Sequence, residues 1–398
     1  MQEFTGLQYL MIDIASHFGL DKKDWGVRLD WTITHEDELE ELLVKADEPA
    51  LYYAAVQAYR AVQREELIGY PISLDATSSG LQILACLACD ELSAKLCNVI
   101  STGHREDAYT NIYMKMCAKL GEQGKILRED VKRAVMTSLY GSEAVPEEVF
   151  GEGVLLNIFH QTMEEEAYLA WELNKMLLRL WDDNALMTNW ILPDNFHVQI
   201  KVMDKIKETF HFLNEPYQVI KKVNKPIKNG RSLGANIVHS LDGMIVREVQ
   251  RRCNYNKNTI KRVLNAINTT ISCYKEDEDA VMVKTLWNHY KESGYLSARI
   301  LNHINGNNII LVDRKVIQEL IDSLPEEPFE LLTIHDCFRC HPNYGNDLRK
   351  QYNIQLAMIA KSDMLNYILT QCLGRKFNLK KDNPDMWKKV LDAEYALS

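Results

Sequence analysis

The chain has 398 residues, of which 46% are hydrophobic and 26% charged, a balance typical of globular proteins with a large core. Glycine and proline number only 18 and 10, and nine cysteines are spread along the chain, which excludes collagen-like, disordered and disulfide-stapled classes. The sequence has no apolar run of about 18 residues and no signal-peptide pattern at its start. We therefore expect a reduced cytosolic protein without a membrane span.

Charge is distributed unevenly along this acidic chain, whose formal net charge is −10. That balance argues against nonspecific binding of the whole chain to nucleic acid or anionic lipid. Between Lys221 and Arg262, however, eleven Lys and Arg residues stand against two acids. Charge alone leaves two interpretations open, a solvated face or a track for a polyanion.

The hydrophobic pattern predicts a helix-rich chain without repeats or a Gly/Ser linker. The acidic segment HEDELEELLVKADE (35–48) has the spacing of a surface helix, and NKPIKNGRSLGAN (224–236) is expected to be an exposed loop. Short strands are predicted at YPISLD, NIILVD and ELLTIHD. Spacing near 3.6 residues predicts helices at 50–65, 79–97, 104–120, 126–140, 158–181, 257–274, 281–300 and 346–373.

Several common catalytic motifs are absent from the sequence. It has no GxxxxGK[ST], HExxH or GxSxG pattern, which excludes ordinary P-loop NTPases, zincins and serine hydrolases. Two CxxC pairs, Cys86 with Cys89 and Cys337 with Cys340, suggest a zinc or redox site. We favour a structural role, because the first pair lies in an apolar helix where cysteine acts as a small hydrophobe.

Three segments carry side chains that suit phosphate and metal chemistry. In YPISLDATSSGLQIL a strand ends at Asp75 before a helix N-terminus, although an aspartate that only closes a turn would fit equally well. In ILREDVKRAVMTSLYGSEA, Arg128 and Lys132 are four residues apart on one helix face, as in an anion site or a solvated basic face. In ELLTIHDCF an apolar strand leads to His335 and Asp336, and Mg²⁺ would compensate the charge of such a carboxylate.

In order and spacing these segments resemble motifs A, B and C of the single-subunit RNA polymerases of bacteriophages and mitochondria. Motif A is DATSSGLQ, motif B is RxxxKRxVMTxxYGS and motif C is IHDCF. GANIVHSLDGMIVRE, GLDKK, HREDAYTNIY and the ending LDAEYALS resemble further stretches of the family. A closer resemblance is to the larger, catalytic subunit of the heterodimeric RNA polymerases of N-four-like phages, which implies action in the cytoplasm of an infected bacterium.

The resemblance implies a role for each matching residue. Asp75, Asp336 and the carbonyl of Ala76 would hold two Mg²⁺ ions, with His335 supporting that site. Substrate-binding roles are implied for Arg128, Lys132, Tyr140, His239, Lys22, Gly80 and Tyr109. Lys132 would also protonate the leaving pyrophosphate, and Tyr140 would close the insertion pocket beside the ribose.

The same resemblance predicts the fold and the product. It implies a mostly helical α+β fold, a right-hand polymerase's palm and fingers around a small antiparallel sheet. Palm is expected at 1–103 and 240–398, with fingers at 104–239. Gly80 stands where the DNA-making relatives carry a glutamate that blocks the 2′-hydroxyl, which favours RNA synthesis from NTPs on a DNA template. The alternatives are a DNA polymerase fragment and a catalytically inactive, polymerase-like binding subunit.

The sequence also departs from the family pattern. The interval from the fingers motif to His239 is shorter than in the single-chain members, where it carries the hairpin that reads promoter bases in the major groove, and this leaves direct promoter readout by the chain open. An insertion at about 245–325 carries basic residues that either follow nucleic-acid phosphates or belong to a purely structural helical pair: Arg247, Arg251, Arg252, Lys257, Lys261 and Arg262.

A DxxGR element, whose arginine binds the template and hybrid in single-chain members, is absent from the 398 residues. We therefore expect a second polymerase subunit that carries this element and the N-terminal domain. A promoter-opening or single-strand-binding factor is expected as a further partner.

Overall fold

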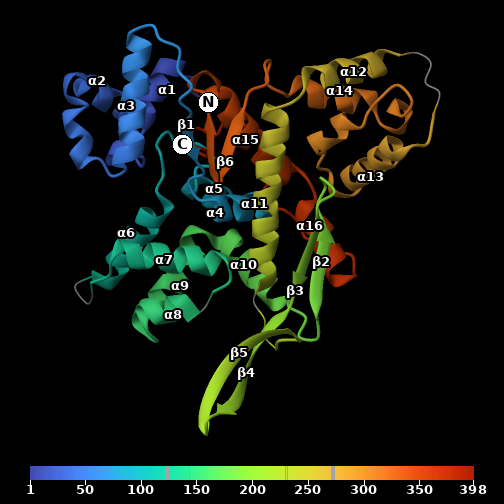
Figure 1. Ribbon diagram of the computed structural model, residues 1–398. Helices are drawn as coiled ribbons and strands as arrows, with labels where there is room; N and C mark the ends of the chain where they lie inside the picture. Colours follow the sequence, from blue (N-terminus) through green and yellow to red (C-terminus); the bar gives the residue numbers. More distant parts are fainter. Residues whose placement is uncertain (122–124, 143, 229, 231, 270–273) are drawn as a thin grey trace.

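The computed structural model describes residues 1–121, 125–142, 144–228, 230, 232–269 and 274–398. Helices surround a small antiparallel sheet near the centre of the molecule (Figure 1), so the predicted mostly helical α+β class is confirmed. In the described part of the chain, no helix is both long and apolar enough to cross a membrane.

The central sheet has three strands in the order β1-β7-β6, all antiparallel. Side chains in β1 alternate, with Ile72 and Leu74 buried, as expected for a strand with one face on the core. Two of the three predicted strands are present here, and their bounds are Ile72–Asp75 (β1), Leu331–Ile334 (β6) and Cys337–Cys340 (β7).

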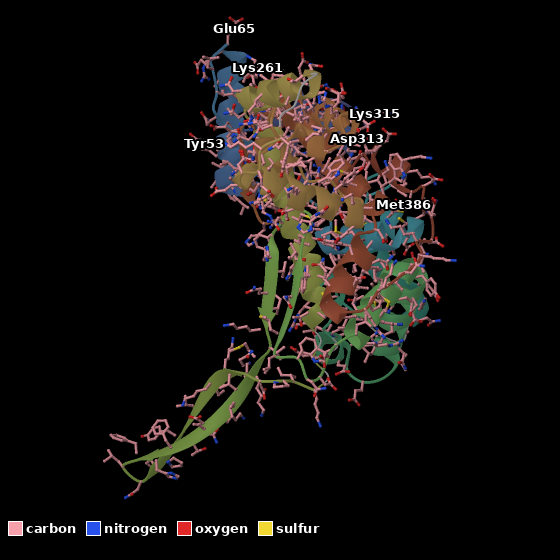
Figure 2. All side chains as sticks on the ribbon, turned by 90° about the vertical axis from the view of Figure 1, so that its right-hand side faces the viewer. Tyr53, Glu65, Lys261, Asp313, Lys315 and Met386 are labelled. Atoms are coloured by element: carbon pink, nitrogen blue, oxygen red, sulfur yellow. The ribbon has the colours of Figure 1, made fainter. Side chains whose placement is uncertain are left out.

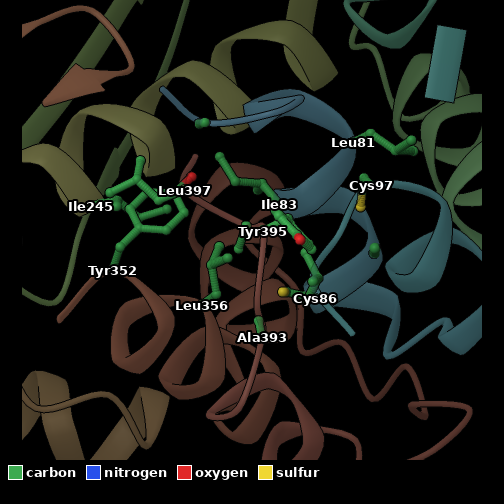
Figure 3. Close-up of a cluster of buried hydrophobic side chains, with 14 of the residues drawn as sticks. Leu81, Ile83, Cys86, Cys97, Ile245, Tyr352, Leu356, Ala393, Tyr395 and Leu397 are labelled. Carbon is green, nitrogen blue, oxygen red and sulfur yellow. The ribbon is translucent and has the colours of Figure 1, made fainter. Parts of the chain in front are cut away.

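The main hydrophobic core lies between the sheet and three helices (Figure 3). Helix α4 (Ser79–Ala88) contacts two long helices, α11 (Ser232–Cys253) and α15 (Gly345–Lys361). Its Gln82 side chain is fully buried. The Gln82 amide donates to the carbonyls of Cys97 (3.1 Å) and Ala396 (2.9 Å), and its oxygen accepts from the Tyr352 hydroxyl (2.8 Å). This single side chain therefore ties together α4, α15 and the C-terminal tail beside α11.

Three N-terminal helices pack together at one side of the sheet (Figure 1): α1 (Gly6–Ala15), α2 (Trp25–Thr34) and α3 (Pro49–Gln63). The predicted surface helix at 35–48 is wrong, because the segment forms two short 3₁₀ turns, Glu36–Glu38 and Glu41–Lys45. Closely spaced acids repel one another along a helix, and only Leu39, Leu42 and Ala46 are buried from this segment.

A second group of helices covers residues that were predicted to form the fingers. The predicted helix at 79–97 divides at Cys89, whose backbone is left-handed (φ 53°), and the one at 158–181 divides at Ala167. Helix α5 (Glu91–Leu96) still belongs to the predicted palm range. The helices in the predicted fingers are α6 (Ala108–Leu120), α7 (Arg128–Leu139), α8 (Ala144–Phe150), α9 (Val154–Glu166) and α10 (Tyr168–Arg179).

Two hairpins precede α11, and one of them projects far from the body of the molecule (Figures 1 and 2). The short interval before His239 thus contains a long hairpin. The turn of the long hairpin is Leu213–Asn214, with φ values of 51° and 65°, a two-residue connection without the usual Asn-Gly signal. The strands are β2 (Met187–Ile191), β3 (His197–Lys201), β4 (Met203–Phe212) and β5 (Glu215–Asn224).

The predicted insertion builds a second, smaller hydrophobic core. It includes α12 (Lys257–Asn268), α13 (Glu278–Ser293) and α14 (Arg314–Asp322). NIILVD is not a strand but contains a 3₁₀ turn, Ile309–Leu311, in which Ile309 enters this core. The boundary predicted between 239 and 240 lies within the continuous helix α11.

The predicted helix at 346–373 divides at Ser362 into α15 and α16 (Met364–Leu373). The chain then passes through α17 (Trp387–Val390) and returns to the central sheet. Leu397 bridges to Ala76, and Ser398 exchanges two backbone hydrogen bonds with Asp75, of 2.9 and 3.3 Å. The C-terminus thus lies directly beside the end of β1.

Candidate active site

The sheet brings together the two carboxylates singled out in the sequence. Asp75 is the last residue of β1 and pairs with Cys337, the first residue of β7. Asp336 immediately precedes Cys337 in the two-residue connection from β6, and the Ala76 amide donates to its carbonyl at 3.1 Å. His335 completes this connection in a left-handed conformation (φ 57°) that is uncommon for a residue with a side chain. The tight turn therefore presents Asp336 beside Asp75.

The two carboxylates repel each other in their ionised forms. Burial raises the pKa of Asp75, and Asp336 adds to the increase, although a hydrogen bond from the Cys337 thiol opposes it. Burial and Asp75 together raise the pKa of the Cys337 thiol, which stays protonated as a donor. The site consequently holds uncompensated negative charge at the ends of two adjacent strands.

Helix α7 places cations on the other side of a cavity that begins at Asp75. Acids in its first turn, Glu129 and Asp130, favour the helix N-terminus, and Val131, Ala134, Val135 and Ser138 form its buried face. Lys132 is half-buried and has no ion-pair partner among the residues that the structure describes. Lys22, which is about half exposed, and Arg128 line the same cavity.

Arg128 is held by neighbouring groups on α6 and α7. Its Nε donates to the Thr110 hydroxyl (2.7 Å), one terminal nitrogen pairs with Asp107 (2.6 Å), and the other pairs with Glu129 (3.0 Å). Asp107 also caps α6 by accepting from the amides of Tyr109 (3.2 Å) and Thr110. Burial alone would raise the pKa of Asp107, but these hydrogen bonds lower it overall.

A second group of site residues is formed by Gly80, Tyr140 and His239, which are in contact with one another through the Tyr140 ring. A Cβ at Gly80 would lie 3.1 Å from the Tyr140 hydroxyl oxygen, so the ring covers the glycine directly. The Tyr140 ring also contacts the His239 ring, with centroids 4.6 Å apart. Tyr109 lies nearby, its hydroxyl 3.2 Å from that of Ser78. The predicted substrate-binding residues therefore all line one of three cavities, which share Tyr109, Tyr140 and Asp336 among their lining residues.

Asp242 is a site residue that the sequence analysis did not select. It lies on α11 one turn after His239, and both line a cavity with Tyr140, His335 and Asp336. Burial, with a contribution from Asp336, raises the pKa of Asp242 to about 6, while His335 opposes the increase. The sequence could have identified Asp242 by its spacing of three residues from His239, because that spacing puts both side chains on one helix face.

Five of the six basic residues predicted to contact nucleic acid have protein partners in the structure. Arg247 and Arg251 bind the fully buried Asp194 at 2.7 and 3.0 Å, and Arg251 also binds buried Glu248. Burial alone would raise the pKa of Asp194, but the two arginines lower it overall. Arg252 is 1% exposed and donates to Gln351 and Ser323.

Arg262 donates to the backbone carbonyls of Leu301, Asn302 and Ile304, which removes it as well from the predicted nucleic-acid track. Lys257 pairs with Glu327 at the surface. Lys261 is exposed and lies at the end of the molecule opposite the long hairpin (Figure 2). Within the basic stretch, Arg247 and Arg251 therefore neutralise buried acids, and Arg262 binds backbone carbonyls.

The CxxC pairs show no metal-binding arrangement. Cys86 and Cys89 are buried, with burial raising both thiol pKa values, and Cys337 and Cys340 lie in β7. Within the described ranges, no group of three or more His, Cys, Asp or Glu side chains is arranged to hold a metal ion. A divalent ion at Asp75 and Asp336 would thus need further oxygen ligands from water or substrate.

Comparison with known proteins assigns the chain to a family. Residues 2–203 match the model of the family described as DNA-dependent RNA polymerase. This chain belongs to that polymerase family. The match includes Asp75, Lys132 and Tyr140 and ends before His239 and Asp336.

Three fungal proteins are similar in sequence to this chain. The chain is 29% identical over 166 residues to the mitochondrial DNA-directed RNA polymerase of Schizosaccharomyces pombe, covering 34% of this chain and 14% of the relative. It is 22% identical over 370 residues to a probable DNA-directed RNA polymerase of Neurospora crassa (85% and 38%). It is 23% identical over 380 residues to one of Gelasinospora (87% and 41%). The chain spans less than half the length of these relatives.

The raised pKa of Asp242 predicts a pH-dependent effect of Asp242→Asn in the polymerase. Ionised Asp242 destabilises the folded state, so its penalty is absent below about pH 4, develops as the pH rises toward 6 and is complete above it. Without divalent metal, the variant should gain about 1 kcal/mol of unfolding free energy at pH 8, after allowance for solvent screening, and little at pH 4.5. Urea denaturation at both pH values measures this, with exposed Asp30→Asn as the control. An equal gain at both would contradict the assignment.

Proposed function

We propose that this chain is the catalytic part of a DNA-directed RNA polymerase, which adds nucleotides from NTPs to the 3′ end of RNA on a DNA template. The observation that carries the proposal is the convergence at one cavity of Asp75, Asp336 and the cations of α7. Family membership supports the same activity.

The residues at the strand ends fit a pair of Mg²⁺ ions. Asp75 and Asp336 supply carboxylate oxygens, and the carbonyl of Ala76 is a third candidate ligand. Burial, with a contribution from Asp336, raises the pKa of Asp75, and a cation would stabilise its ionised form. When bound, such ions activate the attacking hydroxyl and neutralise the leaving pyrophosphate. The protein's own contribution is to fix both carboxylates on hydrogen-bonded strands, where neither can withdraw from the other.

The remaining residues bind and orient the substrate. Lys132, without an ion-pair partner in the described structure, is free to contact the triphosphate and to donate a proton to pyrophosphate as it leaves. Arg128 is held in place by Asp107 and Glu129 at the same cavity. Tyr140 and His239 form a surface for the sugar and the base edge, and they line a cavity together with Asp336.

Asp75→Asn and Asp336→Asn should each abolish nucleotide addition, reducing it at least 1,000-fold, because each removes a charge that positions metal for phosphoryl transfer. Both variants should remain folded by circular dichroism, since amide and carboxylate have the same shape. Extension of a labelled RNA primer on single-stranded DNA measures the loss, and exposed Asp30→Asn serves as the matched control. Normal extension by either variant would overturn the metal-site proposal.

The geometry at Gly80 favours ribonucleotides over the alternative of a DNA polymerase. Gly80 offers no side chain against the 2′-hydroxyl, and the Tyr140 hydroxyl lies close to its Cα. Intact Asp75, Lys132 and Asp336 argue against the other alternative, an inactive binding subunit.

Tyr140→Phe keeps the ring on Gly80 and removes only the hydroxyl. We expect the preference for rNTP over dNTP to fall about tenfold, with a smaller change in the rate of rNTP addition, because one hydrogen bond near the sugar is lost. Competition between rNTP and dNTP in primer extension measures this preference, with exposed Tyr168→Phe as the control. An unchanged preference would assign Tyr140 a packing role only.

We also propose that the long hairpin contacts DNA. Its register places Lys205 directly opposite Lys222, and Lys207 follows on the same face. Like charges opposite each other destabilise a strand pair, and a phosphate backbone would remove the repulsion. This hairpin lies in the interval where the single-subunit RNA polymerases carry their promoter-reading hairpin. We therefore propose the hairpin, rather than the arginines of α11, as the candidate DNA surface.

The finer proposal is that the enzyme is a heterodimer of the N-four-like phage type, acting in the cytoplasm of an infected bacterium with a further single-strand-binding factor to open promoters. The relatives are more than twice as long as this chain, so a polymerase of their kind needs additional polypeptide. Edge strand β6 also exposes Leu332 and Ile334, 58% and 57% accessible, which is a surface that proteins usually cover.

Purification of the native protein under mild conditions should yield a second polypeptide carrying a DxxGR element in equal amounts. The interface should bury about 2,000 Å² or more, and Leu332→Lys should weaken it at least tenfold without lowering the melting temperature of the isolated chain. Mass spectrometry and sedimentation measure both effects, and exposed Leu67→Lys is the control. A monomer of this size that transcribes processively, or a single longer chain, would contradict the heterodimer.

A further inference from the structure

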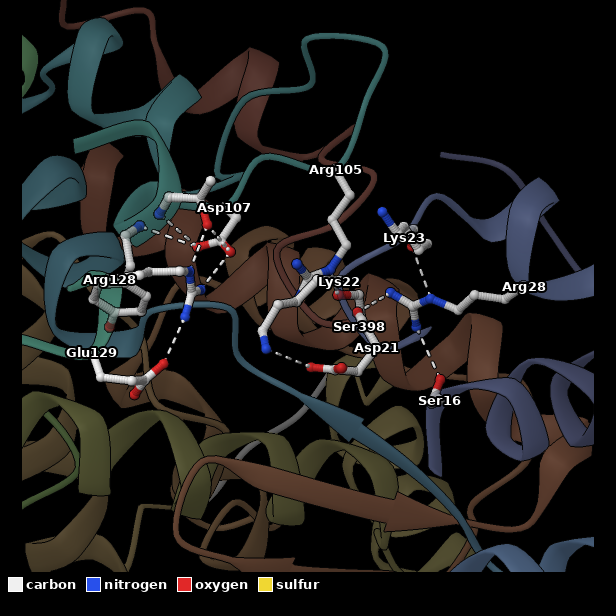
Figure 4. A network of polar contacts seen from close by, with 12 residues as sticks. Ser16, Asp21, Lys22, Lys23, Arg28, Arg105, Asp107, Arg128, Glu129 and Ser398 are labelled. Carbon is white, nitrogen blue, oxygen red and sulfur yellow. Dashed lines mark hydrogen bonds and ion pairs between the residues drawn. The ribbon is translucent and has the colours of Figure 1, made fainter. Parts of the chain in front are cut away.

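Arg105 lies in the segment between α5 and α6, where two contacts fix its position (Figure 4). Its backbone amide donates to a carboxylate oxygen of Asp24 at 2.6 Å. Its Nε donates to the hydroxyl of Ser398, the last residue of the chain, at 3.0 Å. Ser398 in turn is hydrogen-bonded through its backbone to Asp75. The chain terminus therefore links the guanidinium of Arg105 to the end of the strand that bears the candidate metal ligand.

Arg105 lines the cavity that also contains Lys22, Asp75, Arg128 and Lys132. In the described part of the structure, its two terminal nitrogens have no hydrogen-bond partner. All three guanidinium nitrogens of Arg128, by contrast, are engaged by Thr110, Asp107 and Glu129. Arg105 is thus the guanidinium in this cavity with donors available for a ligand.

The local charges favour an anion next to Arg105. Besides burial, the charge of Arg105 lowers the pKa of the buried Arg28 guanidinium, so the two cations lie close enough to repel each other. Burial lowers the pKa of Arg105 itself. Asp21 and Asp107 offset this only in part. A polyphosphate between Arg105 and Lys132 would neutralise both cations, and a guanidinium fork matches two phosphate oxygens.

We propose that Arg105, positioned by Ser398, is an additional contact to the terminal phosphates of the incoming nucleotide and to the pyrophosphate that leaves. This assignment rests on the proposed polymerase function for its substrate, but the anion site itself is a property of the free protein. Ser398 is a positioning residue, because it acts through the Arg105 guanidinium.

The direct test is the binding of inorganic tripolyphosphate to the full chain, measured by titration calorimetry without divalent metal. Arg105→Gln should weaken binding about tenfold, Arg105→Lys less, and Ser398→Ala about two- to fivefold. Arg64→Gln, at an exposed arginine far from the cavity, should bind normally. Melting temperatures identify any variant that has lost its fold, and Ser398→Ala then carries the test alone. Unchanged binding in Arg105→Gln and Ser398→Ala would overturn the proposal and leave Arg105 as a structural anchor.

Nucleotide addition separates this inference from the polymerase proposal. In an active enzyme, Arg105→Gln should raise the KM for NTP and the pyrophosphate concentration for half-inhibition about tenfold, with kcat changed less than threefold. Active enzyme with unaltered KM would refute the role of Arg105 and leave the polymerase proposal intact. If no form of the protein adds nucleotides while Arg105→Gln still weakens tripolyphosphate binding, the polymerase proposal fails and the anion site stands.

Discussion

Hydrogen bonding between β1 and β7 is the interaction on which the candidate site depends. Asp75 and Asp336 are far apart in the sequence, and only the pairing of Asp75 with Cys337 holds their carboxylates next to each other against mutual repulsion. The strands can sustain this repulsion because Ile72, Leu74 and Phe338 anchor them in the main core. The C-terminal tail adds to the same end of β1 through Ser398, so the terminus of the chain also stabilises the strand end.

The site separates its charges into two sides. Asp75 and Asp336 lie at the strand ends, and Lys22, Arg105, Arg128 and Lys132 line the cavity that begins at Asp75. Figure 4 shows Lys22, Arg105 and Arg128 of this group. A nucleoside triphosphate with bound divalent ions would fit between these sides, because it presents cations to the carboxylates and phosphates to the basic residues. Tyr140 and His239, whose rings are in contact, line a cavity with Asp336 and Asp242. Burial there, with a contribution from Asp336, raises the pKa of Asp242.

Much of this arrangement could be predicted from sequence where local pattern and structure agree. The strands ending at Asp75 and at Ile334 and the helix bearing Arg128 and Lys132 follow from apolar spacing, and their order resembled a known family. NIILVD was misjudged because its Ile309 enters a separate core from a 3₁₀ turn, so that burial rather than strand pairing accounts for the apolar residue. The long hairpin was missed because Leu213–Asn214 adopts positive φ without glycine.

Long-range partners were the main feature that sequence could not supply. The basic stretch suggested a polyanion track, but buried Asp194 and Glu248 engage Arg247 and Arg251. Arg105 carried no signal of its own, because its position depends on Ser398 at the other end of the chain. In both cases the fold determines whether a charged side chain is available to a ligand.

The central claim is that Asp75 and Asp336 together hold the divalent ions of a nucleotidyl transfer site. Anomalous diffraction from crystals grown with Mn²⁺, a primed DNA template and a non-hydrolysable NTP analogue tests it most directly. The account predicts two manganese peaks between the carboxylates of Asp75 and Asp336, with the triphosphate extending toward Lys132 and Arg105. Manganese bound elsewhere, with neither carboxylate in contact with metal or nucleotide, would contradict it.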